Sequence, residues 1–126
     1  MESNISQGEI WLVNFDPSIG NEIQKTRPCV VINDDRLGRF GIKVVVPITE
    51  WKDYLSKYPW ILKIENNSLN GLAKVSGIEC FQVKSFSTER FVKKLGILDK
   101  NMVKKIHKLV IKVLNPAYEL MEDFKL

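Results

Sequence analysis

Histidine and cysteine are scarce in this sequence. His107 is the only histidine, and Cys29 and Cys80 are the only cysteines, far apart and without C-x-x-C spacing. With so few soft ligands, neither a first-row metal site nor a Ser-His-Asp triad is expected. His107 lies among lysines in a helical pattern, which favours a solvated polar face over a catalytic role. Each cysteine lies in an apolar run, which favours a reduced, buried thiol over a disulfide.

Long hydrophobic runs and phosphate-cradling glycine loops are also missing. No apolar stretch approaches the roughly 20 residues of a membrane helix, and the N-terminus has no signal-peptide core. We therefore expect a cytoplasmic protein without membrane contact. The 19 basic and 15 acidic residues give a net charge of +4. That mild excess suits a polyanionic partner without requiring one.

The length and apolar content predict one domain. A chain of 126 residues with 44% hydrophobic residues can bury a single core, so residues 1–126 are expected to form one unit. The polar residues 1–7 are expected to be frayed, and residues 115–126 to be a C-terminal extension.

Short runs of apolar and β-branched residues predict a mainly β domain. The predicted strands cover residues 9–15, 29–32, 42–48, 60–64 and 78–83. A polar loop rich in turn formers, residues 16–26, separates the first two. Several short strands with little helix between them predict a small antiparallel barrel.

The pattern changes to helical spacing after Asp99. Apolar residues recur every three or four positions from Met102 to Leu114, with lysines on the remaining surface. Asp99 is the predicted N-cap, and Pro116 would stop the helix. The predicted fold class is thus α+β, mainly β with one C-terminal helix long enough to lie across an open end of the barrel.

Arg27 and Thr49 are the residues whose positions suggest chemistry. Arg27 lies where the polar loop meets a buried strand, so its guanidinium can face outward and bind a phosphate in bidentate fashion. Position alone favours the alternative, a rim arginine paired with an acid such as Glu22 or Asp16. Thr49 ends a buried strand, where its hydroxyl can donate to a phosphate oxygen or satisfy a backbone carbonyl. Trp51 follows in a predicted loop and is a candidate for contact with a base.

These residues belong to a longer motif. Its members are Gly8-Glu9-Ile10-Trp11, Phe15-Asp16-Pro17, Gly20, Glu22, Lys25-Thr26-Arg27-Pro28-Cys29-Val30-Val31, Val46-Pro47-Ile48-Thr49, Tyr58-Pro59, Gly71-Leu72, Gln82-Val83-Lys84 and Leu98-Asp99. In order and spacing the motif resembles the MazF/PemK family of bacterial type II toxins. The resemblance extends over residues 8–114.

The resemblance implies a fold, an activity and partners. The fold would be an SH3-like plasmid-toxin barrel, and the protein a homodimer. The activity would be sequence-specific cleavage of single-stranded RNA without a metal or other cofactor. The partner would be a cognate antitoxin that wraps the toxin and blocks its RNA groove. DNA would be reached only indirectly, through the complex with the antitoxin.

The resemblance also implies roles for individual residues. Arg27 matches the family's catalytic arginine, Thr49 its catalytic threonine, and Glu22 a loop glutamate that is either a general base or part of a loop salt bridge. The RNA 2′-hydroxyl would be the nucleophile, so the protein need only orient it and stabilise charge on the phosphate. The residues expected to contact RNA are Asn21, Lys25, Thr26, Trp51, Gln82 and Lys84.

Three positions depart from the family pattern. Phe81 replaces an acid, Lys84 replaces an arginine, and Glu50 follows Thr49 where serine or threonine is common. These changes bear on the recognition sequence. Two alternatives share the fold: a gyrase poison similar to CcdB, which needs neither Arg27 nor Thr49, and a catalytically inactive RNA-binding barrel.

Overall fold

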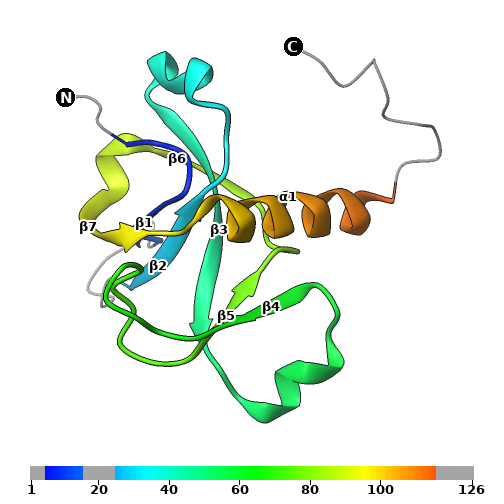
Figure 1. Cartoon of the computed structure of the whole chain (residues 1–126). Helices are drawn as coiled ribbons and strands as arrows, with labels where there is room; N and C mark the ends of the chain where they lie inside the picture. The colour runs from blue at the N-terminus through cyan, green and yellow to red at the C-terminus, as the bar shows by residue number, and fades with distance from the viewer. Residues whose placement is uncertain (1–4, 16–24, 116–126) are drawn as a thin grey trace.

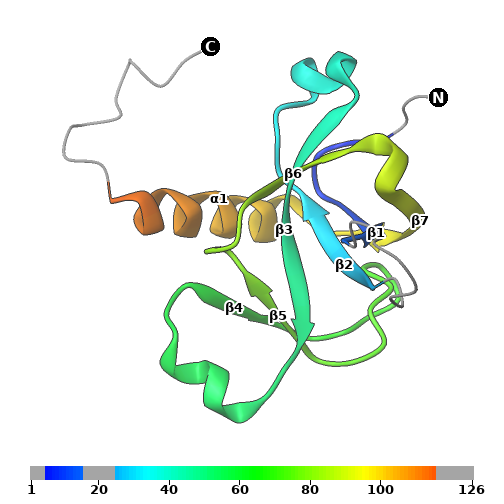
Figure 2. The same cartoon turned by 180° about the vertical axis from the view of Figure 1, so that it is seen from behind.

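The computed structural model describes residues 5–15 and 25–115 (Figures 1 and 2). The strands are β1 (Glu9–Asn14), β2 (Thr26–Val31), β3 (Ile42–Glu50), β4 (Ile61–Ile64), β5 (Ser76–Glu79), β6 (Lys84–Ser87) and β7 (Phe91–Ile97). One α-helix, α1 (Lys100–Leu114), follows β7. Three short 3-10 helices connect strands: η1 (Asp35–Phe40), η2 (Asp53–Lys57) and η3 (Thr88–Arg90).

All strands pair antiparallel around the long strand β3. The order is β4-β5-β3-β2-β1-β7, and β6 pairs with the first half of β3. The last three residues of β3 pair with β5. Among the described elements, the outer strands β4 and β7 are not paired with each other, so the sheet is open rather than a closed barrel. The predicted fold class, antiparallel β with one C-terminal helix, is confirmed.

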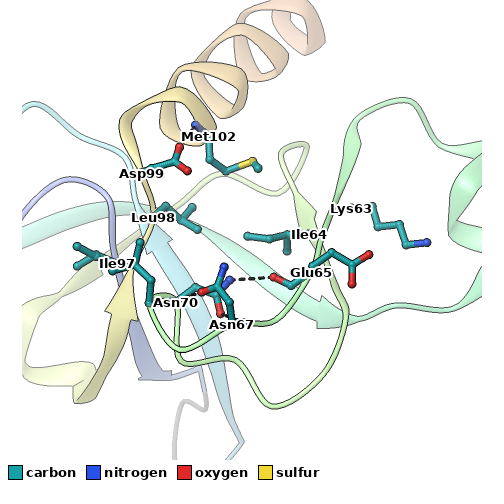
Figure 3. A pocket seen from close by; sticks show the side chains of 10 residues that line it. Lys63, Ile64, Glu65, Asn67, Asn70, Ile97, Leu98, Asp99 and Met102 are labelled. Carbon is teal, nitrogen blue, oxygen red and sulfur yellow. Dashed lines mark hydrogen bonds between the residues drawn. The ribbon is translucent and has the colours of Figure 1, made fainter.

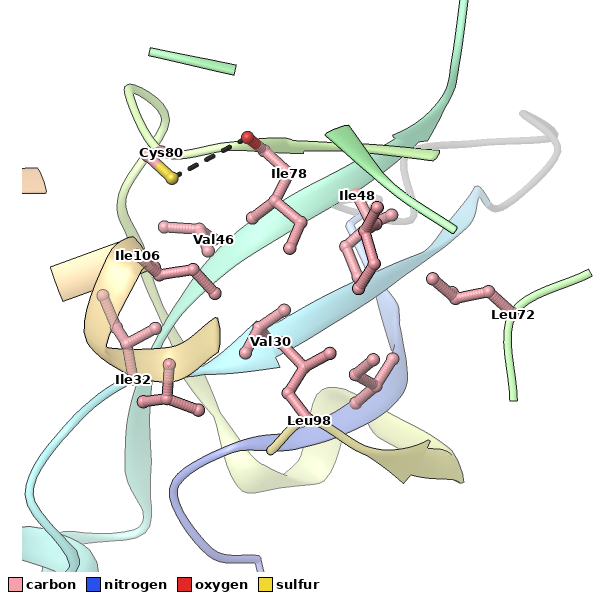
Figure 4. Packing of buried hydrophobic residues seen from close by; sticks show 12 residues of the cluster. Val30, Ile32, Val46, Ile48, Leu72, Ile78, Cys80, Leu98 and Ile106 are labelled. Atoms are coloured by element: carbon pink, nitrogen blue, oxygen red, sulfur yellow. Dashed lines mark hydrogen bonds between the residues drawn. The ribbon is translucent and has the colours of Figure 1, made fainter. Parts of the chain in front are cut away.

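The core lies on both sides of this sheet because strand side chains alternate between faces. Val30 and Val46 pack with Ile78 and Ile106 in a cluster that α1 covers (Figure 4). Figures 1 and 2 show α1 on one side of β2 and β3. On the other side, a second cluster contains Ile5, Val13, Cys29, Val31 and Val45, with aromatic rings packed against it.

The helix α1 is placed by its cap and by its apolar stripe. The Asp99 carboxylate accepts a hydrogen bond from the backbone N–H of Met102 at 2.8 Å, so the predicted N-cap is confirmed. Val103 and Ile106 are buried against the sheet. Asn115 ends the helix in the left-handed conformation, with φ of 45°.

A buried asparagine organises the loop between β4 and β5. The Asn70 side-chain oxygen accepts from the backbone N–H groups of Asn67 and Leu72, and its amide donates to the carbonyl of Glu65 at 2.9 Å (Figure 3). This loop and the start of α1 border a pocket of 270 Å³, into which Met102 extends (Figure 3). Its lining residues do not include Arg27 or Thr49.

Several local predictions were wrong. The predicted strand over residues 78–83 ends at Glu79, because a turn closed by the Gln82 N–H and the Glu79 carbonyl interrupts it. The strands β6 and β7 were not predicted. Residues 5–7 are not frayed, since Ile5 is buried and Gln7 donates to the carbonyls of residues 32 and 33. Residues 1–4 and 116–126 lie outside the described part of the chain.

Candidate active site

The strand registers bring Arg27 and Thr49 to the same place. The pairing of β2 with β3 ends where Cys29 is opposite Pro47, and Arg27 and Thr49 each lie two residues beyond this pair. Side chains alternate along a strand, so both residues lie on the face opposite α1. Thr49 is also opposite Gly77 of β5, two residues before Glu79. Glu79 therefore shares that face.

These residues line an open pocket of 410 Å³. Its walls come from the start of β2, the end of β3, the helix η2 and the turn that follows β5. The lining residues are Arg27, Thr49, Glu50, Lys52, Tyr54, Leu55, Glu79 and Gln82. The pocket thus combines cationic, hydroxyl, carboxylate and amide groups from four separate segments.

The guanidinium of Arg27 is accessible and held from two sides. It is 46% exposed, and its Nη1 lies 3.8 Å from Oε2 of Glu79, which is 14% exposed. Its central carbon lies 6.0 Å from the centroid of the Phe15 ring. Glu79 also accepts a hydrogen bond from the Gln82 side chain. Within residues 5–15 and 25–115 the guanidinium donates no hydrogen bond.

Two lysines offset the negative charge of Glu50. Its Oε2 lies 3.5 Å from Nζ of Lys74 and 3.8 Å from Nζ of Lys52. All three side chains are at least 49% exposed, so each contact is weak. The carboxylate beside Thr49 is nevertheless not an isolated negative charge facing the pocket.

The comparison with known protein families identifies the family of this chain. A model of the PemK-like, MazF-like toxins of type II toxin-antitoxin systems matches residues 6–114. The chain belongs to this toxin family. The resemblance predicted from the sequence motif is confirmed, and neither a gyrase poison nor an inactive barrel is favoured by the match.

Relatives of this toxin have been named as nucleases. The chain is similar to Endoribonuclease MazF9 of Mycobacterium tuberculosis, with 34% identity over 97 residues, 71% of this chain and 79% of MazF9. It is 43% identical to Endoribonuclease PemK of Escherichia coli over 49 residues, 38% of this chain and 37% of PemK.

Solved structures of toxins share the fold. A MazE-MazF crystal structure from Deinococcus radiodurans matches with a TM-score of 0.74 and 18% identity, covering 92% of this chain and 100% of the other. An endoribonuclease in complex with its cognate antitoxin from Mycobacterial species matches with a TM-score of 0.66 and 13% identity, covering 93% and 100%. At such low identity the likeness concerns the fold.

Some of the predicted site residues line the pocket of this toxin, and others do not. Arg27, Thr49 and Gln82 line one pocket. The other described candidates, Lys25, Thr26, Trp51 and Lys84, are not among its lining residues. Glu22 and Asn21 lie outside the described residues.

Trp51 and Lys84 have other neighbours in the toxin. Trp51 is half-buried against Gly77, and Nζ of Lys63 lies 5.1 Å from the centroid of its ring. Lys84 is the first residue of β6, opposite Val45. Their predicted contact with RNA therefore stays a prediction.

Glu79 is the site residue that sequence reasoning missed. The acids considered as partners of Arg27 were Glu22 and Asp16, both near it in the chain, whereas Glu79 comes from β5. A signal existed: Ile78 and Cys80 are apolar on either side of Glu79, which predicts an outward-facing carboxylate in a buried strand.

His107 and the cysteines have structural roles. His107 is half-buried rather than solvated as predicted, and its Nε2 lies 2.9 Å from the carbonyl of Ile32. Cys29 and Cys80 are buried, unpaired thiols, as predicted. Burial raises the pKa of Cys29 to about 12, although the charges of Arg27 and Lys84 act to lower it. Burial alone raises the pKa of Cys80 to about 12. Neither thiol is a nucleophile near neutral pH.

The described residues contain no group of three His, Cys, Asp or Glu side chains that could hold a metal ion. None of the helices in the described ranges is long and apolar enough to cross a membrane.

Proposed function

We propose that this toxin is an endoribonuclease that cleaves single-stranded RNA at a short recognition sequence. The observation that carries the proposal is the convergence of Arg27 and Thr49, from different strands, on one open pocket. The names of MazF9 and PemK support the same activity.

The reaction uses the substrate's own nucleophile. The 2′-oxygen attacks the adjacent phosphorus, the bond from phosphorus to O5′ breaks, and the products are a 2′,3′-cyclic phosphate and a 5′-hydroxyl. The 2′-hydroxyl proton passes to a base, and the departing O5′ takes up a proton. No water has to be activated, so the step requires neither a metal nor another cofactor.

Each pocket residue has a distinct task in this reaction. Arg27 neutralises charge on the non-bridging oxygens of the phosphate, because a guanidinium offers two parallel donors. An arginine is a poor general acid because its pKa exceeds about 12, so the electrostatic task is the main one. Thr49 donates to the same phosphate. Glu22 is the proposed general base, and Glu79 keeps the guanidinium of Arg27 at the pocket.

The toxin is further proposed to act in the cytoplasm as a homodimer neutralised by a cognate antitoxin. The solved complexes of MazF with MazE and of a mycobacterial endoribonuclease with its antitoxin support the antitoxin as a partner. The net charge of +4 also suits an acidic inhibitor that competes with RNA. Contact with DNA would then occur only through the antitoxin.

Cleavage of a long single-stranded RNA in EDTA tests the proposal. Mapping of 5′ ends should show cuts at a recurring short motif, with 5′-hydroxyl and cyclic phosphate termini. Arg27→Ala should abolish most cutting. Arg36→Ala is the matched control, because Arg36 is exposed and pairs with Asp34 rather than with the pocket. RNA that stays intact with the wild-type protein would contradict the proposal, and inhibition of gyrase instead would favour the CcdB-like alternative.

A further inference from the structure

Three aromatic rings, two of them exposed, form a row where the start of β4 meets the end of β5. The ring centroids of Tyr58 and Trp60 are 5.5 Å apart, and those of Trp60 and Phe81 are 5.9 Å apart. Trp60 is 36% exposed and Phe81 is 61% exposed. We refer to Tyr58, Trp60 and Phe81 as the aromatic row. Single exposed apolar residues are common on proteins, whereas contiguous exposed rings mark a binding surface.

Backbone pairing holds the row together. The N–H of Cys80 donates to the carbonyl of Trp60 at 3.1 Å, and Ile61 is opposite Glu79 in the pairing of β4 with β5. Trp60 therefore lies beside Cys80, the residue that precedes Phe81. Because the strands fix this spacing, the rings form a surface before any ligand arrives.

The row is linked to the pocket through the backbone at two points. Phe81 lies inside the turn that the Gln82 N–H closes on the Glu79 carbonyl at 3.0 Å, and Glu79 and Gln82 both line the pocket. At the other end, the N–H of Tyr58 donates to the carbonyl of Leu55, another lining residue, at 3.0 Å. Phe81 therefore directly precedes one lining residue, and Tyr58 is bonded to the backbone of another.

We propose that the aromatic row is a stacking platform for bases of the RNA strand next to the phosphate held by Arg27. The inference rests on the proposed function. Aromatic rings stack on every base, and beside cations such as Arg27 and Lys52 they make a typical single-strand binding surface.

A single-stranded RNA is favoured over a protein as the occupant. The row adjoins Arg27 and Lys52 in the pocket, and the exposed Lys57 directly precedes Tyr58. Cations alternating with aromatic rings match a strand of phosphates and bases, whereas a buried protein interface is depleted in lysine.

Binding of a non-cleavable RNA tests the platform. The probe is a short single-stranded RNA that carries the mapped cleavage motif, with 2′-deoxyribose at the cut and 2-aminopurine at each flanking position in turn. Stacking on the row should quench the fluorophore at one or two positions. Phe81→Leu and Trp60→Leu should remove that quenching and raise Kd about 10-fold. At saturating RNA the cleavage rate of each variant should change by less than about 2-fold, because stacking is away from the reacting atoms.

Val92→Ala is the matched control, since Val92 is also 61% exposed but lies on β7 at the opposite edge of the sheet. Equal quenching and Kd in wild-type and Phe81→Leu proteins would refute the platform alone. Two other results would assign the row to a protein interface and also refute the platform. One is a change in the molecular mass of the Phe81→Leu or Trp60→Leu protein, measured by light scattering. The other is loss of antitoxin binding by these variants with an unchanged Kd for RNA. If the wild-type protein cuts no RNA in the cleavage assay, the proposed function fails first and the platform with it.

Discussion

Arg27 is the residue on which the proposed chemistry depends most. Its side chain is partly exposed in a pocket with Thr49, and a guanidinium can donate to two oxygens of one phosphate. We expect Arg27→Ala to lower the single-turnover cleavage rate by at least about 100-fold, the usual effect of losing a donor to a developing oxyanion. Arg27→Lys should be intermediate, because a lysine keeps the charge but not the paired donors. A loss below about 10-fold for Arg27→Ala would assign the catalytic role elsewhere.

Glu79 is expected to have opposite effects on binding and on turnover. Its carboxylate lies 3.8 Å from the Arg27 guanidinium and therefore both positions that group and repels a phosphate. In Glu79→Gln the RNA should bind more tightly, by about 3-fold at low salt, as expected for one partly exposed charge pair. The cleavage rate at saturating RNA should fall, since the guanidinium loses its fixed partner. Weaker RNA binding by Glu79→Gln would show that Glu79 itself contacts the RNA.

The buried thiols make stability sensitive to alkaline pH. The pKa of Cys29 and that of Cys80 are each raised by burial from 9.0 to about 12 in the folded protein. The unfolded chain releases these protons near pH 9, whereas the folded chain holds them. Their contribution to stability is therefore complete below pH 9 and is lost as pH rises toward 12. Urea midpoints should fall across that window, and Cys80→Ala should reduce the slope. Rapid alkylation of both native thiols at about pH 8 would contradict the burial argument.

At the scale of elements, the loop between β4 and β5 depends on Asn70. This side chain is 2% exposed and bonds to three backbone groups of its own loop. Asn70→Ala leaves those groups without partners, so we expect the free energy of unfolding to fall by about 2–3 kcal/mol. Chemical denaturation measures the change. Asn66→Ala, an exposed asparagine in the same loop, is the control and should change stability by less than about 0.5 kcal/mol.

The elements that could be predicted were those with regularly spaced apolar residues and clear start and stop residues. The helix from Lys100 to Leu114 was predicted because its apolar residues recur every three or four positions between an N-cap aspartate and a proline. The strand predicted over residues 78–83 was wrong beyond Glu79, because the apolar residues Phe81 and Val83 are exposed beside a site rather than buried. A run of apolar residues predicts a buried strand, so exposed apolar residues such as Phe81 and Val83 lead to a wrong prediction.

The candidate site was predictable where it is local in sequence. Arg27 lies where a loop meets a buried strand, Thr49 lies at the end of another, and a family motif contains both. The contact of Arg27 with Glu79 depends on the order of β2, β3 and β5, which no local pattern encodes. His107 was misplaced for the same reason, since its partner is the distant carbonyl of Ile32.

At the scale of the whole molecule, the sheet separates the pocket from the lysines of α1. The pocket with Arg27 and Lys52 lies on the face opposite α1, whereas the exposed lysines of α1, including Lys112, lie on the helix side. The net charge of +4 does not distinguish between these surfaces, but the geometry does. If RNA occupies only the pocket face, the lysines of α1 release no counterions on binding.

The salt dependence of RNA binding therefore reports which surface the RNA covers. For single-stranded nucleic acids, the logarithm of the association constant falls with the logarithm of the salt concentration. The slope is about −0.7 for each phosphate neutralised. Removing one cation that contacts a phosphate should make that slope shallower by about 0.7. We expect this for Lys52→Gln, which lines the pocket, and no change for Lys112→Gln, which alters the net charge equally. Titration of the non-cleavable RNA at several KCl concentrations measures both slopes. Equal changes in the slopes of the two variants would contradict this expectation and would mean that the RNA also runs over α1. Both variants lose one positive charge, so only contact with the RNA can make their slopes differ.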